Sequence, residues 1–234
     1  MLLKHIFGRL LGQKARRTPP LTSSTAVLVD FSGENKVAEN DVRVFSDEDF
    51  GGRSKASVES RDDALIFRGV LNSELPEGSG GGERMQRQAI KTLKKSGFAG
   101  FSCSNLLRGE VGGDHKEEGD VYVDVERFQN LKFTVKTDGR TYVVSVKTAP
   151  DDFRGGAHDL WQCFLQGPKD EWCEITIPFR KFIRTWKGGI VQNQRRQVLM
   201  KDALRSIGVA VNKENGGDGD FNLELAKIEA VVDE

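Results

Sequence analysis

The sequence predicts an all-β protein built as an antiparallel β-sandwich. Apolar and polar residues alternate in the segment 131–136 and, less regularly, in the segment 142–147. A period of two places one side of each strand against a core and the other side toward water. Asp138-Gly139, between these segments, is a favourable pair for a two-residue type I′ hairpin turn. Two further strand-like runs, 160–165 and 171–179, are separated by turn residues, so the order along the chain indicates a meander.

Strand patterns on both sides of this region extend the sandwich to most of the chain. They cover the segments 26–31, 42–45, 55–59, 64–70 and 98–104 before it, and 204–211 and 221–232 after it. A chain of 234 residues with 37% apolar content can bury a substantial core, so we expect one domain over residues 26–234. Insertions near 77–97 and 109–120 are expected as loops, and residues 85–95 are predicted to form a short basic helix.

The first twenty residues predict a mitochondrial presequence. Apolar residues recur at helical spacing, the basic residues lie largely off that face, and residues 1–29 contain no acid. Such a basic amphipathic helix is typical of a transit peptide, and an ordinary surface helix or an interfacial membrane helix is the alternative. The apolar runs are too short for a membrane-spanning segment.

Charge and cysteine content narrow the classes of partner and cofactor. The net charge is zero, and the basic amino-terminal segment leaves the remainder mildly acidic, which argues against nucleic-acid binding. The three cysteines form no C-x-x-C pair, so neither a disulfide framework nor a zinc site is predicted. We expect no cofactor.

Acidic residues beside glycines are candidate ligands for a hard cation. Residues 47–49 precede Gly51-Gly52, and Asp218 and Asp220 lie in a second glycine-rich turn. Carboxylates in turns more often accept backbone hydrogen bonds, so we favour that interpretation and predict no metal site.

Aromatic residues and candidate nucleophiles give no catalytic constellation. The aromatic residues of the later part of the chain are Trp161, Trp172, Phe179, Phe182 and Trp186. Most aromatic residues of a sandwich belong to its core, and Trp186, in a polar setting, is the best candidate for a ligand face. No serine lies in a G-x-S-x-G elbow, and we expect no enzyme.

An ordered set of motifs resembles a known family over residues 26–232. The motifs are Ser46-Asp47 followed by Gly51-Gly52-Arg53-Ser54, Phe67-Arg68-Gly69, Ser96-Gly97-Phe98-Ala99-Gly100, Asp138-Gly139-Arg140-Thr141-Tyr142, Trp172 with Ile177-Pro178-Phe179 and Phe182, Ile207-Gly208, and Gly219-Asp220-Phe221 with Ile228. Together they resemble the family of complex I intermediate-associated protein 30. The chain departs from the family pattern near Val42, where an aromatic residue is usual, and at Thr137, where glycine is usual.

The resemblance implies both a fold and a function. The family's sandwich is similar to the galactose-binding jelly roll, and its mitochondrial members hold membrane-arm intermediates of respiratory complex I during assembly. We therefore expect a non-enzymatic assembly factor in the mitochondrial matrix or on the matrix side of the inner membrane. Its partners would be protein subunits or other assembly factors, and it would associate with the membrane only through them. A carbohydrate-binding-type module, or an assembly factor for another organellar complex, is the alternative.

The motif residues divide into structural and partner-binding candidates. Those expected to serve the fold are Gly51, Gly52, Ser54, Asp138, Gly139, Trp172, Pro178 and Phe179. Binding is expected at the loops of one end of the sandwich and on the concave face of one sheet. The candidate partner-binding residues are Arg53, Arg140 and Trp186.

Overall fold

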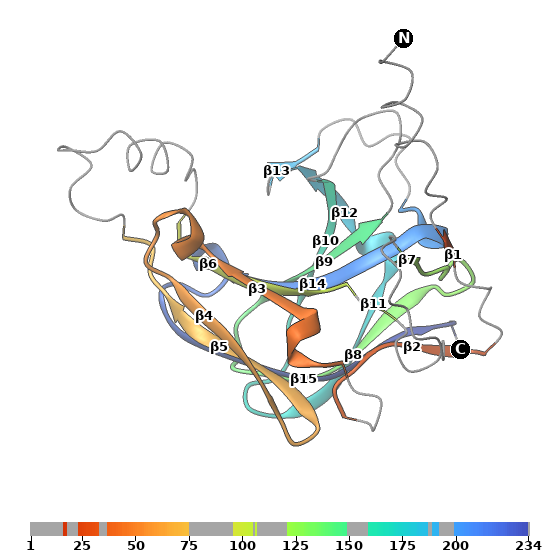
Figure 1. Ribbon diagram of the computed structural model, residues 1–234, viewed down its shortest axis with the longest axis horizontal. Coiled ribbons are helices and arrows are strands. Elements are labelled where there is room, and N and C mark those ends of the chain that lie inside the picture. The colour runs from red at the N-terminus through yellow and green to blue at the C-terminus, as the bar shows by residue number, and fades with distance from the viewer. Residues whose placement is uncertain are drawn as a thin grey trace, which may run out of the picture.

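Two antiparallel sheets stacked face to face form the protein, as the computed structural model shows (Figure 1). The structure describes residues 16–17, 23–32, 37–74, 96–104, 106, 121–148, 159–186, 189–191 and 199–233. Within these ranges, the regular elements are strands and short 3-10 helices. The predicted jelly-roll β-sandwich is therefore confirmed.

One layer is a six-stranded sheet in which the strand β15 is central. Its strands are β11 (Trp172–Pro178), β8 (Asn130–Thr137), β15 (Gly219–Val231), β5 (Ala64–Leu71) and β4 (Lys55–Arg61) in spatial order, with β2 (Thr25–Asp30) also paired to β15. β15 pairs with β5 along its first half, with β2 along its second half and with β8 along most of its length. Register shifts at residues 225–227 and 228–229 mark where β15 bends.

The second layer is a seven-stranded sheet. Its strands in spatial order are β13 (Gly189–Ile190), β12 (Ile183–Trp186), β10 (Asp159–Leu165), β9 (Tyr142–Thr148), β14 (Leu204–Asn212), β6 (Phe98–Cys103) and β3 (Val42–Ser46). At one end, β12 and β13 curl away from the six-stranded sheet (Figure 1). A separate parallel pair joins β1 (Arg16–Arg17) to β7 (Val121–Tyr122).

In the described ranges, five short 3-10 helices join the strands. They are η1 (Glu39–Asp41), η2 (Asp47–Phe50), η3 (Phe179–Lys181), η4 (Lys201–Ala203) and η5 (Lys213–Asn215). None of the described helices has the length and apolar character needed to cross a membrane.

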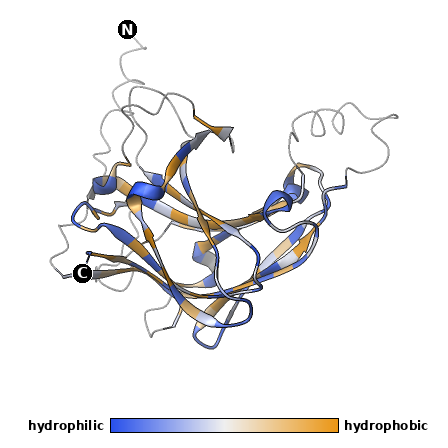
Figure 2. Ribbon diagram, turned by 180° about the vertical axis from the view of Figure 1, so that it is seen from behind, coloured by the Kyte–Doolittle hydropathy of each residue, from blue (hydrophilic) through white to orange (hydrophobic). Residues whose placement is uncertain are grey.

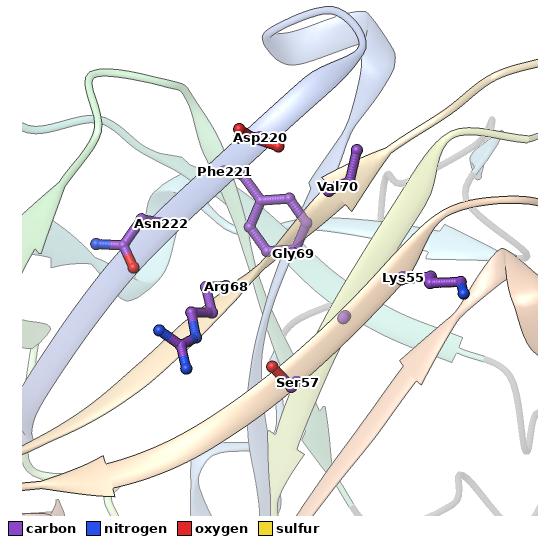
Figure 3. Close-up of a pocket in the computed structure, with 9 residues that line it drawn as sticks. Lys55, Ser57, Arg68, Gly69, Val70, Asp220, Phe221 and Asn222 are labelled. Atoms are coloured by element: carbon purple, nitrogen blue, oxygen red, sulfur yellow. The ribbon is translucent and has the colours of Figure 1, made fainter.

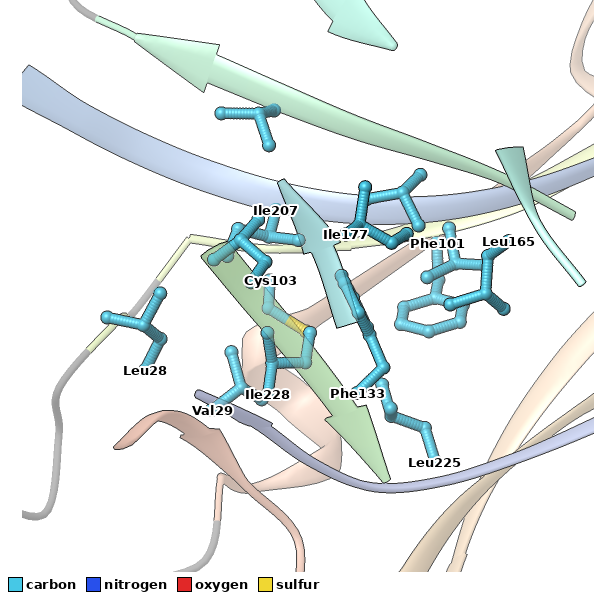
Figure 4. Close-up of a cluster of buried hydrophobic side chains, with 14 of the residues drawn as sticks. Leu28, Val29, Phe101, Cys103, Phe133, Leu165, Ile177, Ile207, Leu225 and Ile228 are labelled. Atoms are coloured by element: carbon cyan, nitrogen blue, oxygen red, sulfur yellow. The ribbon is translucent and has the colours of Figure 1, made fainter. Parts of the chain in front are cut away.

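The core lies between the two layers and is built from the inward-facing residues of both. Along the ribbons, orange and paler or blue residues alternate, as strands with one buried side require (Figure 2). In β8, Leu131, Phe133 and Val135 are buried, whereas the residues between them are partly exposed. Figure 4 shows Phe133 of the six-stranded sheet among side chains from the other layer. Phe67 and Phe101 join the sheets directly, because their ring centroids lie 5.1 Å apart in an edge-to-face arrangement.

The strand positions were predicted well, but the predicted hairpin at Asp138-Gly139 is wrong. β8 belongs to the six-stranded sheet and β9 to the seven-stranded sheet, so residues 138–141 cross between layers. The segment between β10 and β11 crosses in the same way, which excludes the predicted simple meander. The alternation of apolar and polar residues indicates which side of a strand is buried, but it does not indicate which strand lies beside it.

The crossing at 138–141 is fixed by Asp138. Its Oδ1 atom accepts a hydrogen bond from Arg140 N at 3.0 Å, and its Oδ2 atom accepts one from Asn222 N of β15 at 3.0 Å. The Tyr142 hydroxyl lies 2.9 Å from the Asn222 carbonyl oxygen. Gly139 has a φ of 88°, so the predicted positive φ is confirmed although the hairpin is not.

Several sequence predictions lie outside the described residues. These are the helix over residues 85–95, the loop over 109–120, most of the loop over 77–97 and most of the predicted presequence over 1–20. Of that presequence the structure describes Arg16 and Arg17, which form strand β1 and not a helix.

Candidate functional site

The Gly51-Gly52 motif forms a tight turn around a buried carboxylate. Asp47 is fully buried and accepts hydrogen bonds from Ser54 N at 2.8 Å, from Ser54 Oγ at 3.0 Å and from Gly97 N. A Cβ atom at Gly52 would overlap the Asp47 side chain, so only glycine fits there. The carboxylate thus ties η2 to β4 and β6, and its contacts are those of a structural turn. No group of three or more His, Cys, Asp or Glu side chains suited to a metal ion occurs in the described part of the chain.

Arg53 lies next to this turn, on the surface. Its Nη1 atom lies 3.1 Å from Glu74 Oε2. Both side chains are exposed, so the ion pair contributes little to stability and competes weakly with a partner. Binding through Arg53 stays a prediction.

Arg140 makes several contacts within the protein. Its Nη1 atom donates hydrogen bonds to the carbonyl oxygens of Gly216 and Gly217, both at 2.8 Å, and its Nε atom lies 3.4 Å from Asp138 Oδ2. These contacts hold the turn after η5 against the crossing segment. A partner that uses Arg140 has to share these donors, so its partner-binding role also stays a prediction.

Trp186 lies at an apolar edge of the seven-stranded sheet. It is 52% exposed, and three other exposed apolar side chains belong to the same strands: Phe164 at 64%, Ile183 at 43% and Ile190 at 68%. By register, Phe164, Ile183 and Ile190 lie on the outer side of the sheet, and we call these three residues the edge patch; Trp186 lies on the opposite side, which it shares with the buried side chains of Trp161 and Arg184. Exposed apolar residues that occur singly need no explanation, but a group on adjacent strands marks an interaction surface.

The sequence pointed to Trp186, on the opposite side of β12, and the three residues of the edge patch were missed. In the run 160–165, apolar residues occupy both inward and outward positions of the strand. Alternation therefore does not separate outward Phe164 from buried Trp161 and Leu165. β12 and β13 are short and were not predicted as strands.

The outer face of the seven-stranded sheet, which is the side away from the core, is apolar or small in character. By register, its outward positions include Val143 and Ser145 on β9, which pair with Phe164 and Gln162 on β10. Farther along, Ala210 on β14 pairs with Val143 of β9 on one side and with Gly100 of β6 on the other. A Cβ atom at Gly100 would lie 2.5 Å from the Phe45 ring, so Phe45 of β3 packs directly over this glycine.

The outer face of the six-stranded sheet is charged. Lys132 lies 3.0 Å from Glu229, Lys136 lies 3.2 Å from Glu224, and Arg68 lies 2.9 Å from Glu59. The hydrogen bond to Glu229 is the main reason that the pKa of Lys132 is raised. Each cation is matched by an anion on a neighbouring strand, so this face resembles an ordinary solvated surface.

An open hollow of 440 Å³ lies on the six-stranded sheet where β4, β5 and β15 meet (Figure 3). It is lined by Lys55, Ser57, Arg68, Val70 and Asp220 around the backbone of Gly69, together with neighbouring residues. A Cβ atom at Gly69 would overlap the Lys55 carbonyl oxygen, so glycine lets β4 and β5 approach each other here. Arg68 is engaged by Glu59, and the hollow offers mixed charges without a dominant sign.

Burial favours the protonated form of the three cysteine thiols and of Tyr142. Burial raises the pKa of the Cys103 thiol to about 12, and it also raises the pKa of Cys163 and Cys173. A raised pKa lowers the thiolate fraction, which is the nucleophilic form. The pKa of Tyr142 is raised as well, first by burial and then by the Asp138 carboxylate.

The fold is a jelly-roll β-sandwich of the kind found in carbohydrate-binding modules. Over 91% of the chain, it is similar to the family 11 carbohydrate-binding module of Clostridium thermocellum in complex with a β-1,3-1,4-mixed-linked tetrasaccharide, with a TM-score of 0.52, 16% identity and 98% of that chain covered. The family 11 module of the cellulosomal cellulase Lic26A-Cel5E from the same organism gives a TM-score of 0.53 at 16% identity, with 91% of this chain and 97% of that one covered. At this identity the likeness shows the fold alone.

Sequence comparison then identifies the family. The model of the complex I intermediate-associated protein 30 family matches residues 29–225, and the chain belongs to that family. The mitochondrial complex I intermediate-associated protein 30 of Mus musculus is 29% identical over 197 residues, which are 81% of this chain and 52% of the mouse protein. The chain thus spans about half the length of this curated relative.

Proposed function

We propose that this protein is a non-enzymatic assembly factor that binds membrane-arm intermediates of mitochondrial respiratory complex I. The observation that carries the proposal is the family match over residues 29–225, which includes nearly all of the described sandwich. A binding role requires only that the protein prefer the unfinished client to the finished complex. The partners would be subunits of complex I or other assembly factors.

The outer faces of the two sheets differ in chemical character, and this difference supports a binding surface on only one of them. The six-stranded sheet carries paired charges, whereas the edge patch of the seven-stranded sheet exposes apolar side chains that need a partner to leave water. The proposed binding surface is therefore the edge patch and the outer face beside it. Arg53 and Arg140 are kept as proposed partner contacts at the loops.

The proposed location is the matrix side of the inner mitochondrial membrane, reached through the basic segment 1–20. Residues 1–20 fused to a fluorescent reporter are expected to direct it to mitochondria. A cytosolic or exported reporter would contradict the targeting proposal and leave the binding surface untouched.

The assembly function is tested in cells that lack the protein. Mature complex I is expected to fall and partial membrane-arm intermediates to accumulate on native gels, and the wild-type chain should restore the mature complex. Phe164→Ala should restore it less well, and Trp172→Ala serves as the control because Trp172 is an exposed aromatic residue on the other sheet. Normal complex I in the null cells would refute the proposal.

A carbohydrate-binding role is the second candidate, and the fold similarity to family 11 modules favours it. Titration of the purified protein with β-1,3-1,4-linked glucan oligosaccharides separates the two candidates. Saturable binding that is lost in Trp186→Ala would favour the carbohydrate module. Normal complex I together with a defect in a different organellar complex would favour the other assembly role.

A further inference from the structure

We propose that the edge patch and the adjoining outer face bind an amphipathic α-helix of a protein partner, one that carries Asp or Glu beside its apolar residues. This inference rests on the proposed function, because it assumes a protein client. It adds the shape and the charge of the client segment.

The apolar contact is built from neighbouring strands. Phe164 pairs directly with Val143, and Ile183 pairs with Gln162, so Phe164 and Ile183 are diagonal neighbours on the same side of the sheet. Ile190 is in register with Thr185 and therefore lies diagonally from Ile183. Diagonal neighbours lie within reach of long side chains, so these residues form one continuous apolar surface.

A helix is the secondary structure that suits this face. The interior strands β9, β10 and β14 have their backbone groups paired on both sides, so the face offers a partner side chains and no ladder hydrogen bonds. An extended segment laid across it would bury unpaired N–H and C=O groups, which is costly. An α-helix satisfies these groups internally and can place an apolar stripe on the sheet.

The dimensions also fit a helix. Neighbouring strands lie about 4.8 Å apart and a helix with its side chains is about 10–12 Å wide, so a helix on this face would cover two to three strands. Beside Phe164, the strands β9 and β14 present Ser145 and Ala210 outward, whose short side chains leave room for the helix.

The charged residues on and beside this face indicate which kind of helix would bind there. At the paired outward positions that the structure describes on this sheet, the charged residues are Lys147 on β9, near the edge patch, and Arg43 on β3, at the far edge, with no Asp or Glu. Two more exposed cations, Arg180 and Lys181, lie in η3 immediately before β12. A second copy of this face, or the basic segment 1–17 of this chain, would place cations against cations. An acidic helix complements the surface.

The test uses the full chain and two synthetic, fluorescein-labelled peptides of 18 residues. Both carry the same Leu and Ile stripe at helical spacing, and one has Glu and the other Lys at the flanking positions. Fluorescence anisotropy is expected to show saturable binding of the Glu peptide and at least tenfold weaker binding of the Lys peptide. A third peptide, residues 1–17 of this chain, should bind no better than the Lys peptide.

Variants locate the binding surface. The double variant Phe164→Ser with Ile183→Ser should lower the affinity for the Glu peptide at least tenfold, and Trp172→Ser, on the other sheet, should leave it unchanged. Lys147→Glu should weaken the Glu peptide and strengthen the Lys peptide, which is a reversal that partial unfolding does not produce. The thermal midpoint of each variant is measured alongside.

Three results would overturn the inference: equal binding of the Glu and Lys peptides, no saturable binding of either peptide, or unchanged binding in the folded double variant. Binding of glucan or concentration-dependent self-association through the edge patch, in place of peptide binding, would also overturn it. If the peptide experiments fail and null cells still show a complex I defect, the proposed helix-binding surface is wrong and the proposed assembly function is retained.

Discussion

Replacement of Asp47 by Asn tests how the turn between β3 and β4 is held. The carboxylate is fully buried and receives hydrogen bonds from Ser54 N, Ser54 Oγ and Gly97 N. Asn has almost the same shape, but only one of its two terminal atoms accepts a hydrogen bond. Its amide group would therefore face at least one N–H or O–H donor, and that donor would be left buried without an acceptor.

The expected cost follows from these contacts. A hydrogen bond to a charged group contributes about 1.5–3 kcal/mol, and an unsatisfied buried donor costs about 1–3 kcal/mol. Because one contact survives in Asn, we expect a loss of about 3 kcal/mol in the free energy of unfolding. For a protein of this size, about 1 kcal/mol changes the thermal midpoint by roughly 2–4 °C, so the midpoint should fall by about 6–12 °C.

Differential scanning calorimetry and urea unfolding at neutral pH measure the effect. Asp63→Asn is the matched control, because Asp63 is exposed in the turn between β4 and β5, and its midpoint should change by less than about 2 °C. An Asp47→Asn midpoint equal to that of the wild type would refute the role assigned to the buried carboxylate. A large rise in the wild-type midpoint with added Ca²⁺ would show instead that an ion is held there.

Two further predictions concern turns. Gly139→Val should lower the free energy of unfolding by about 1–3 kcal/mol because φ is 88° at this position, whereas Gly189→Ala, which meets only an ordinary contact at 3.6 Å, should stay within about 0.5 kcal/mol on urea unfolding. Hydrogen bonds from Ser73 lower the pKa of Asp218, so its contribution to stability is present above its ordinary pKa and is lost as the pH falls through the lowered value. Asp218→Asn should therefore melt below the wild type at pH 7, and the gap should close as the pH falls below about 4; a gap that is constant with pH would contradict this origin.

The strands could be predicted from the sequence, whereas their partners could not. In 131–136, each inward residue is apolar and each outward residue is polar, so the pattern alone defines β8. The same pattern does not record that Thr137 ends a strand of one layer and Tyr142 begins a strand of the other. That information lies in contacts such as Asp138 with Asn222, which join residues far apart in the sequence.

None of the three residues of the edge patch was predicted from the sequence, and the predicted Trp186 is exposed on the opposite side of β12. Arg53 and Arg140 were selected because they belong to family motifs, and the structure gives both of them contacts within the chain. Phe164 and Ile183 belong to no family motif, and their exposure is set by the register of β10 and β12. A surface formed by several strands can be predicted only when the order of the strands in the sheet is known.

The central position of β15 has a consequence for how the protein reaches its folded state. β15 follows its partners β2, β5 and β8 in the chain, yet it fills the space among them. Until β15 is synthesised, or has passed through a membrane channel behind the rest of the chain, those strands lack their main neighbour and expose unpaired edges. The late strand makes the six-stranded sheet an all-or-none structure, formed slowly from distant segments and prone to aggregate before it closes. A protein proposed to guard unfinished assemblies would thus itself need protection while its last long strand is missing.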